Sequence, residues 1–184
     1  MFRLTDQGLI EGIRFLPSPN CEERPVGAQI SLLVIHNISL PPGQFGTGDI
    51  EDLFLNRLDS SRHPYFETIA DLRVSAHLVI DRNGDITQFV PLHMRAWHAG
   101  QSCFDGCDNC NDFSIGIELE GSDDVAYSEE QYQALGSITH SLLDRYPQLS
   151  RDRICGHSDI APGRKTDPGP AFQWTHFYEL LDQL

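Results

Sequence analysis

The segment from residue 113 to residue 120 constrains the fold of this 184-residue chain most strongly, because its side chains alternate strictly in character. Successive side chains of a β-strand point to opposite faces of the sheet. The alternation therefore predicts a strand with one buried face, and small residues on the other face leave room for a ligand beside Glu118. The apolar set is Phe113, Ile115, Ile117 and Leu119, and the other set is Ser114, Gly116, Glu118 and Glu120.

The other patterned segments predict an α/β fold with a mixed central β-sheet and packed helices. Short apolar runs predict strands at residues 30–35 and 153–155. Two further runs, 74–81 and 85–90, flank an Asn83-Gly84 turn and predict a hairpin, so the sheet is not all parallel. Helices are expected at 49–58, from the Ser128 cap to Pro147, and at 174–181. Segments rich in Pro, Gly or charged residues predict loops at 17–29, 39–48, 99–112 and 161–170.

The net charge of −14 argues against two classes of partner. Nucleic acids and anionic membrane surfaces are both bound by clustered Lys and Arg. The first residues lack the pattern of a signal peptide, and the longest strongly apolar run, 32–35, is far shorter than the roughly 18 residues that span a bilayer. We therefore expect a cytoplasmic protein with no nucleic-acid or membrane partner, and no obligate protein partner is implied.

The five cysteines are expected to be reduced, because their number is odd and no export signal is visible. Cys103, Cys107 and Cys110 are spaced as in some structural zinc sites, for which His98 or Asp108 would have to supply the fourth ligand. The interpretation that we prefer is a polar loop whose cysteines bind no metal.

Two of the eight histidines directly follow predicted strands, His36 after 30–35 and His157 after 153–155. Strand ends and the loops above them are where α/β folds place ligands and catalytic groups. Asp167 lies in a loop stiffened by two prolines. Two histidines and one carboxylate are a common catalytic zinc set that leaves a fourth position for water or substrate. The spacing alone is a weak signal, because no compact motif joins the three residues.

Glu118 and Lys165 are candidates for the chemistry itself. A carboxylate beside a metal-bound water is a natural general base, although a solvent-facing glutamate on a one-sided sheet explains Glu118 equally well. Lys165 is the single lysine beside twelve arginines. Compositional bias toward Arg explains this count, but it also predicts that a lysine persists where Arg cannot replace it.

Several stretches together resemble a known enzyme family. They are VIHNISLPPG (34–43), VSAH (74–77), RAWHAG (95–100), NDFSIGIELEG (111–121) and GHSDIAPGRKTDPG (156–169). The chain resembles the type-2 N-acetylmuramoyl-L-alanine amidases, and most closely their cytosolic branch, the 1,6-anhydro-N-acetylmuramyl-L-alanine amidases of cell-wall recycling. The resemblance runs from about residue 17 to residue 174, so a single amidase domain spanning 1–184 is expected.

The resemblance implies a role for each matched position. The zinc ligands would be His36, His157 and Asp167, the general base Glu118, and the oxyanion-stabilising group Lys165. Substrate contacts are expected from Asn37, Arg73, Trp97 and His98, with burial in the core as the alternative for Trp97. The implied reaction is zinc-dependent hydrolysis of the lactyl amide bond between (1,6-anhydro-)N-acetylmuramic acid and L-alanine in soluble muropeptides, at a shallow site above one sheet edge.

Two other functions stay open at this point. Some relatives in the peptidoglycan-recognition group bind wall fragments without cutting them, typically because a metal ligand is missing; here all three matched ligands are present. An exported amidase that acts on intact peptidoglycan is the second alternative. The absence of a recognisable signal peptide argues against it.

Overall fold

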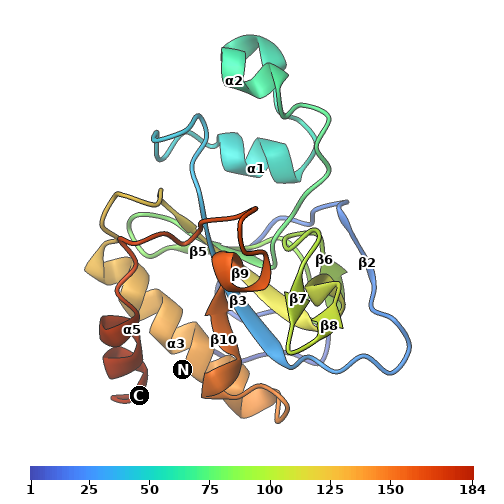
Figure 1. The fold of residues 1–184 in the computed structure, drawn as a ribbon, viewed down its shortest axis with the longest axis vertical. Coiled ribbons are helices and arrows are strands. Elements are labelled where there is room, and N and C mark those ends of the chain that lie inside the picture. The colour runs from blue at the N-terminus through green and yellow to red at the C-terminus, as the bar shows by residue number, and fades with distance from the viewer.

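Six strands form the central sheet in the order β1-β5-β4-β9-β3-β10, in a computed structural model that describes residues 1–184 (Figure 1). The pair β4–β5 is antiparallel and every other neighbouring pair is parallel, so the predicted mixed sheet is confirmed. These strands are β1 (Arg14–Phe15), β3 (Leu32–Ile38), β4 (Leu78–Ile80), β5 (Ile86–Gln88), β9 (Ser114–Glu120) and β10 (Ile154–Gly156).

Shorter elements complete the chain. Two small antiparallel ladders pair β2 (Cys21–Glu23) with β6 (Met94–Ala96) and β7 (Cys103–Phe104) with β8 (Cys107–Asp108). The helices are α1 (Asp49–Phe54), α2 (Pro64–Glu67), α3 (Glu129–Arg145), α4 (His157–Ile160) and α5 (Trp174–Leu181), and the single 3₁₀ turns are Ser60–Arg62, Cys110–Asp112 and Arg151–Arg153. None of the helices is long and apolar enough to cross a membrane.

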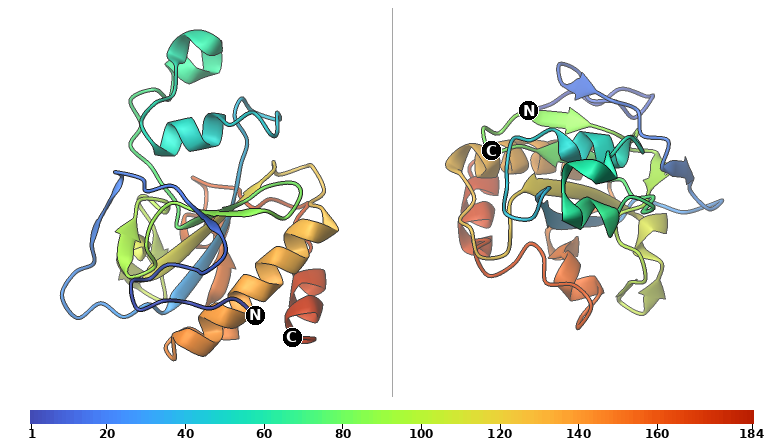
Figure 2. Two further views of the ribbon diagram at one scale, coloured as in Figure 1. Left: turned by 180° about the vertical axis from the view of Figure 1, so that it is seen from behind. Right: turned by 90° about the horizontal axis from the view of Figure 1, so that it is seen from above.

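Different helices pack on the two faces of the sheet. The apolar face of β9 packs on α3 and α5, whose side chains complete the largest core cluster. These two helices lie side by side, with both chain termini next to them (Figures 1 and 2). Over the other face, α1 and α2 project from one end of the molecule and contribute Leu53, Phe54 and Phe66 to a second core (Figure 1). The alternation in 113–120 therefore separates an apolar layer from the face that carries Glu118.

The register of the central strands brings polar residues together on this second face. Strand β3 pairs in parallel with β9 over its whole length, and His36 lies opposite Glu118. The prediction that His36 follows its strand was wrong, because pairing with β9 extends β3 to Ile38. The site consequently lies on this face of the sheet, over β9 and β3 and at the end of β10, the strand at one edge of the sheet.

Other predicted elements differ mainly in their ends. The helix expected at 49–58 stops at Phe54, and Asn56 adopts φ 57°, a left-handed conformation that asparagine tolerates. Within 74–81 only Leu78–Ile80 forms a strand, and β2, β7 and β8 lie inside segments that were predicted as loops. The α3 capping box of Ser128 and Gln131 is confirmed, and α5 has the predicted bounds.

Candidate active site

Three buried side chains converge at the centre of the site. The Nδ1 atoms of His36 and His157 are 2.9 Å apart, and each is 3.0 Å from Oδ2 of Asp167. Exposure is 1%, 2% and 9% for the three residues, respectively. Strand β3 supplies His36, the first residue of α4 supplies His157, and the following loop returns to supply Asp167. The structure thus brings together residues 36, 157 and 167, which form a group that could hold a metal ion.

The hydrogen bonds behind this group indicate that a cation belongs in it. Nε2 of His157 is 3.0 Å from the main-chain carbonyl oxygen of Ala99, which can only accept, so Nε2 carries the proton. Nδ1 of a neutral His157 is then a bare acceptor that faces the carboxylate of Asp167. Two acceptors at this distance are stable only with a proton or a metal ion between them, and here a third such atom, Nδ1 of His36, converges on the same point. The donor set and its convergence therefore fit a metal.

Electrostatics in the group follow from its burial. Burial lowers the pKa of His36 to about 4, which favours the neutral, ligating form. Burial alone would raise the pKa of Asp167, but the close approach of the polar His157 and His36 rings holds this pKa well below its usual range. Asp167 is therefore a carboxylate and the two imidazoles offer lone pairs.

Glu118 is the neighbour of His36 on the adjacent strand, and its Oε2 atom is buried without a hydrogen-bond partner. Burial raises the pKa of Glu118 well above its ordinary value, and the nearby charge of Asp167 raises it further while Lys165 lowers it. A buried carboxylate oxygen without a partner is costly unless a ligand or water occupies its free position. Glu118 as a whole is half-buried, and its remaining exposed surface faces a cleft.

A cleft of about 350 Å³ opens over these groups. Its polar lining includes Glu118, Lys165 and Asp167. Apolar lining residues come from α1 and the segment around α2: Leu53, Phe54, Tyr65, Ile69 and Leu72. Lys165 is exposed in the cleft, so its ammonium group can reach a bound molecule. A larger cavity of about 650 Å³ lies beside the β4–β5 hairpin, but no residue of the metal group lines it.

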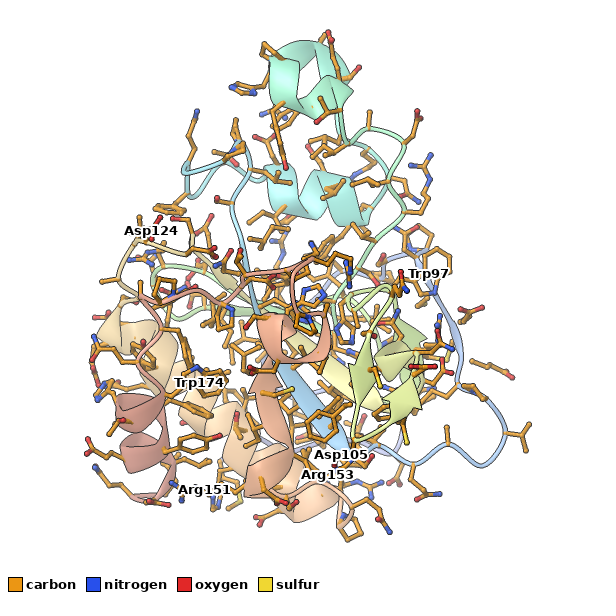
Figure 3. The ribbon with its side chains drawn as sticks, viewed as in Figure 1. Trp97, Asp105, Asp124, Arg151, Arg153 and Trp174 are labelled. Carbon is orange, nitrogen blue, oxygen red and sulfur yellow. The ribbon has the colours of Figure 1, made fainter.

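The four expected substrate contacts lie in different places. Trp97 is half-buried in the cleft wall, outside every core cluster, and its Nε1 donates to Glu22 in β2 at 3.1 Å; Figure 3 shows it at the margin of the molecule. Arg73 is exposed between two cleft-lining neighbours and is not itself part of the lining. Its guanidinium donates to the carbonyl oxygens of Ala70 and Leu72.

Asn37 and His98 line the cleft, but their polar atoms are engaged within the protein. The Asn37 amide donates to Asp123 Oδ1 at 2.8 Å and to the carbonyl oxygen of Pro168 at 3.1 Å. His98 is 9% exposed, and its Nδ1 lies 2.9 Å from Nε2 of His36.

Sequence reasoning missed the residues that hold the loop of Asp167. The carbonyl oxygen of Pro168 accepts from Tyr127 Oη at 2.7 Å as well as from Asn37. Burial raises the pKa of Tyr127, so its hydroxyl remains a donor. Gly169 lies so close to Asp123 that a Cβ atom would be 2.3 Å from its Cα. No local pattern marks Tyr127 for this role, because it acts across the fold.

The sequence pattern of the N-acetylmuramoyl-L-alanine amidase family matches residues 26–170, which include every residue of the metal group. The chain belongs to this family. Over 180 residues the amidase is 53% identical to the 1,6-anhydro-N-acetylmuramyl-L-alanine amidase AmpD of Escherichia coli K12, with 98% of each chain covered.

Solved structures agree with this assignment. A crystal structure of a selenomethionine derivative of AmpD superposes on the amidase with a TM-score of 0.94 at 52% identity, covering 97% of this chain and 99% of that one. A second similar structure is the E. coli amidase AmiD in complex with the substrate anhydro-N-acetylmuramic acid-L-Ala-D-γ-Glu-L-Lys. Its TM-score is 0.60 at 31% identity, covering 88% of this chain and 65% of that chain.

Proposed function

We propose that this amidase hydrolyses the bond between the lactyl group of 1,6-anhydro-N-acetylmuramic acid and L-alanine in soluble cell-wall fragments, with Zn²⁺ as its cofactor. The observation that carries the proposal is the buried group of His36, His157 and Asp167 beside the partnerless Glu118 carboxylate. The names of the relatives support the substrate: the E. coli AmpD is named for the 1,6-anhydro-N-acetylmuramyl-L-alanine bond.

The donor set favours zinc over other divalent ions. Two imidazole nitrogens and one carboxylate oxygen are a common protein set at catalytic zinc sites. Tetrahedral zinc with bonds of about 2.0–2.1 Å separates its ligand atoms by about 3.3 Å. The distances of 2.9–3.0 Å among His36, His157 and Asp167 are close to this value. Calcium and magnesium, in contrast, prefer all-oxygen ligands.

Different residues around the metal group carry out different steps of amide hydrolysis. Zinc bound there would polarise the lactyl carbonyl and increase the acidity of water. Glu118 accepts the proton of the attacking water at its free Oε2 atom and transfers it to the leaving amine of L-alanine. Lys165 carries a compact positive charge into the cleft and stabilises the oxygen that becomes negative in the tetrahedral intermediate. The apolar walls contributed by the α1–α2 segment make the surroundings of the reacting groups less polar, which strengthens their electrostatic interactions.

We propose substrate contacts for Trp97 at the cleft wall and for Arg73 at its rim, where a guanidinium can bind a carboxylate of the stem peptide with two hydrogen bonds. Asn37 also lines the cleft. We also propose a cytoplasmic location, for which the five unpaired cysteines are support, since thiols stay reduced there.

Metal content and product mass test the proposal together. Purified protein is expected to contain one zinc per chain, and His157→Ala to lose it, because His157 provides one of three protein ligands. A defined anhydro-muropeptide should yield free peptide and anhydro-N-acetylmuramic acid. Cleavage of intact sacculi in preference to the soluble fragment would support the exported wall amidase, and tight binding without cleavage by zinc-loaded protein would support the binding module. Either result would overturn the proposed reaction.

A further inference from the structure

The two histidines of the metal group are held from behind by different kinds of partner. Nε2 of His157 donates to a main-chain carbonyl oxygen, that of Ala99. Nε2 of His36 instead lies 2.9 Å from Nδ1 of another histidine, His98. The orientation of His157 is therefore set by the backbone, whereas the orientation of His36 depends on one side chain.

His98 is itself fixed on three sides. Its Nε2 atom lies 3.1 Å from Oγ of Ser114, and its main-chain N–H donates to Oδ1 of Asn111 at 3.1 Å. The ring lies against Gly116, where a Cβ atom would be only 2.4 Å from Cγ of the imidazole. The small residues on the polar face of β9 thus make the space that this ring fills.

These contacts define one consistent arrangement of protons. When Nδ1 of His36 is a ligand atom, its proton is on Nε2, which then donates to Nδ1 of His98. His98 consequently carries its own proton on Nε2 and donates it to Oγ of Ser114, a hydroxyl that can accept. With Nδ1 of His36 bound to a metal, the hydrogen bonds from Ser114 to His36 are all made only in this tautomeric state, because the reverse set, in which Ser114 donates, would place a proton on Nδ1 of His36.

We propose that His98 is a positioning residue, which holds His36 in the tautomer and orientation that metal binding requires. Both of its ring nitrogens are occupied by protein groups, so it contacts no substrate polar atom without breaking this chain. Partners behind metal-bound histidines commonly increase metal affinity by 10- to 100-fold. The inference rests on the zinc site of the proposed function and names a residue on which its affinity depends.

Competition with a chromophoric chelator, at equal ionic strength and pH, gives the zinc dissociation constant of each variant. His98→Phe removes the acceptor but keeps a planar ring of similar size, and it should weaken zinc binding by roughly 10- to 100-fold. His98→Asn places an amide oxygen where Nδ1 stood and should restore most of this loss. His176→Phe is the matched control, because His176 lies on α5 outside the site and should leave the affinity unchanged.

Nitrogen-15 NMR of the zinc-loaded protein adds a readout of the hydrogen bond between His36 and His98 itself. The Nε2–H proton of His36 should be visible and protected from exchange in wild type and in His98→Asn, and should exchange rapidly in His98→Phe. If His98→Phe does not fold, Ser114→Ala can be compared with His98→Asn instead. Ser114→Ala should weaken zinc binding by less than the roughly 10- to 100-fold expected of His98→Phe.

The results that would contradict the role of His98 differ from those that would contradict the proposed function. A wild-type protein that binds no stoichiometric zinc would overturn the proposed function itself. A wild type that binds zinc, combined with unchanged affinity and an unchanged His36 signal in His98→Phe, would overturn only the role of His98. Equal losses in His98→Phe and His98→Asn would also refute it, because the retained acceptor should have compensated.

Discussion

Replacing Gly116 by alanine should damage the site through a single atom. The new Cβ would lie 2.4, 2.5 and 2.7 Å from Cγ, Nδ1 and Cδ2 of His98, whereas carbon atoms in good contact are about 3.5–4.0 Å apart. The ring must therefore move by about 1 Å. It cannot do so without lengthening its hydrogen bonds to His36 and Ser114.

The size of the effect follows from these contacts. Overpacking in a close-packed interior costs about 1–3 kcal/mol, and each disrupted hydrogen bond adds about 0.5–1.5 kcal/mol. The expected loss in the free energy of unfolding is therefore about 2–6 kcal/mol. For a protein of this length each kcal/mol lowers Tm by about 2–4 °C, so a decrease of roughly 4–24 °C is expected. Zinc affinity should decrease as well, since the displaced ring no longer orients His36.

Calorimetry or denaturant unfolding in the presence of a chelator isolates the packing cost, because bound metal would otherwise stabilise the folded state. Gly136→Ala in α3 is the matched control. Its Cβ would meet Leu184 and Leu180 at 3.6 and 3.9 Å, which is ordinary contact, and alanine in a helix should stabilise by about 0.5–1 kcal/mol. If Gly116→Ala is as stable as wild type and binds zinc equally well, the rigid placement of His98 is refuted.

Three further substitutions test the remaining roles. Glu118→Ala should keep zinc and lose about 10²-fold or more in turnover, because no other group accepts the proton; near-normal turnover of the zinc-loaded variant would count against the base assignment. Lys165→Ala should lower kcat and kcat/KM together by about 10²–10³-fold with little change in KM, and Lys165→Arg should restore only part of the lost kcat. An effect confined to KM would make Lys165 a substrate anchor instead. Tyr127→Phe removes one of two donors to the Pro168 carbonyl oxygen. The free energy of unfolding should decrease by roughly 1–3 kcal/mol, and zinc binding should weaken because the Asp167 loop is held less firmly. A variant with wild-type Tm and zinc affinity would show that Asn37 alone holds this loop.

Local patterns in the sequence were sufficient to predict the fold class and several elements. The alternation in 113–120 indicated which face of β9 packs in the apolar core, although the other face is mostly buried as well. The capping box at Ser128 and Gln131 marked the start of α3 for a similarly local reason. The family resemblance then led to the residues that the structure brings together as His36, His157 and Asp167.

Only the tertiary structure decided how far strands extend and what each polar group contacts. Strand β3 continues through His36 because β9 pairs with it, and this pairing is invisible in the local sequence. His98 and Asn37 belong to motifs that suggest substrate contact, yet their hydrogen bonds go to His36 and Pro168, residues that are distant along the chain. Hydrogen-bond partners depend on which segments meet in space. The sequence, through its family resemblance, therefore led to the candidate reacting groups, while the folded chain determined which residues hold them in place.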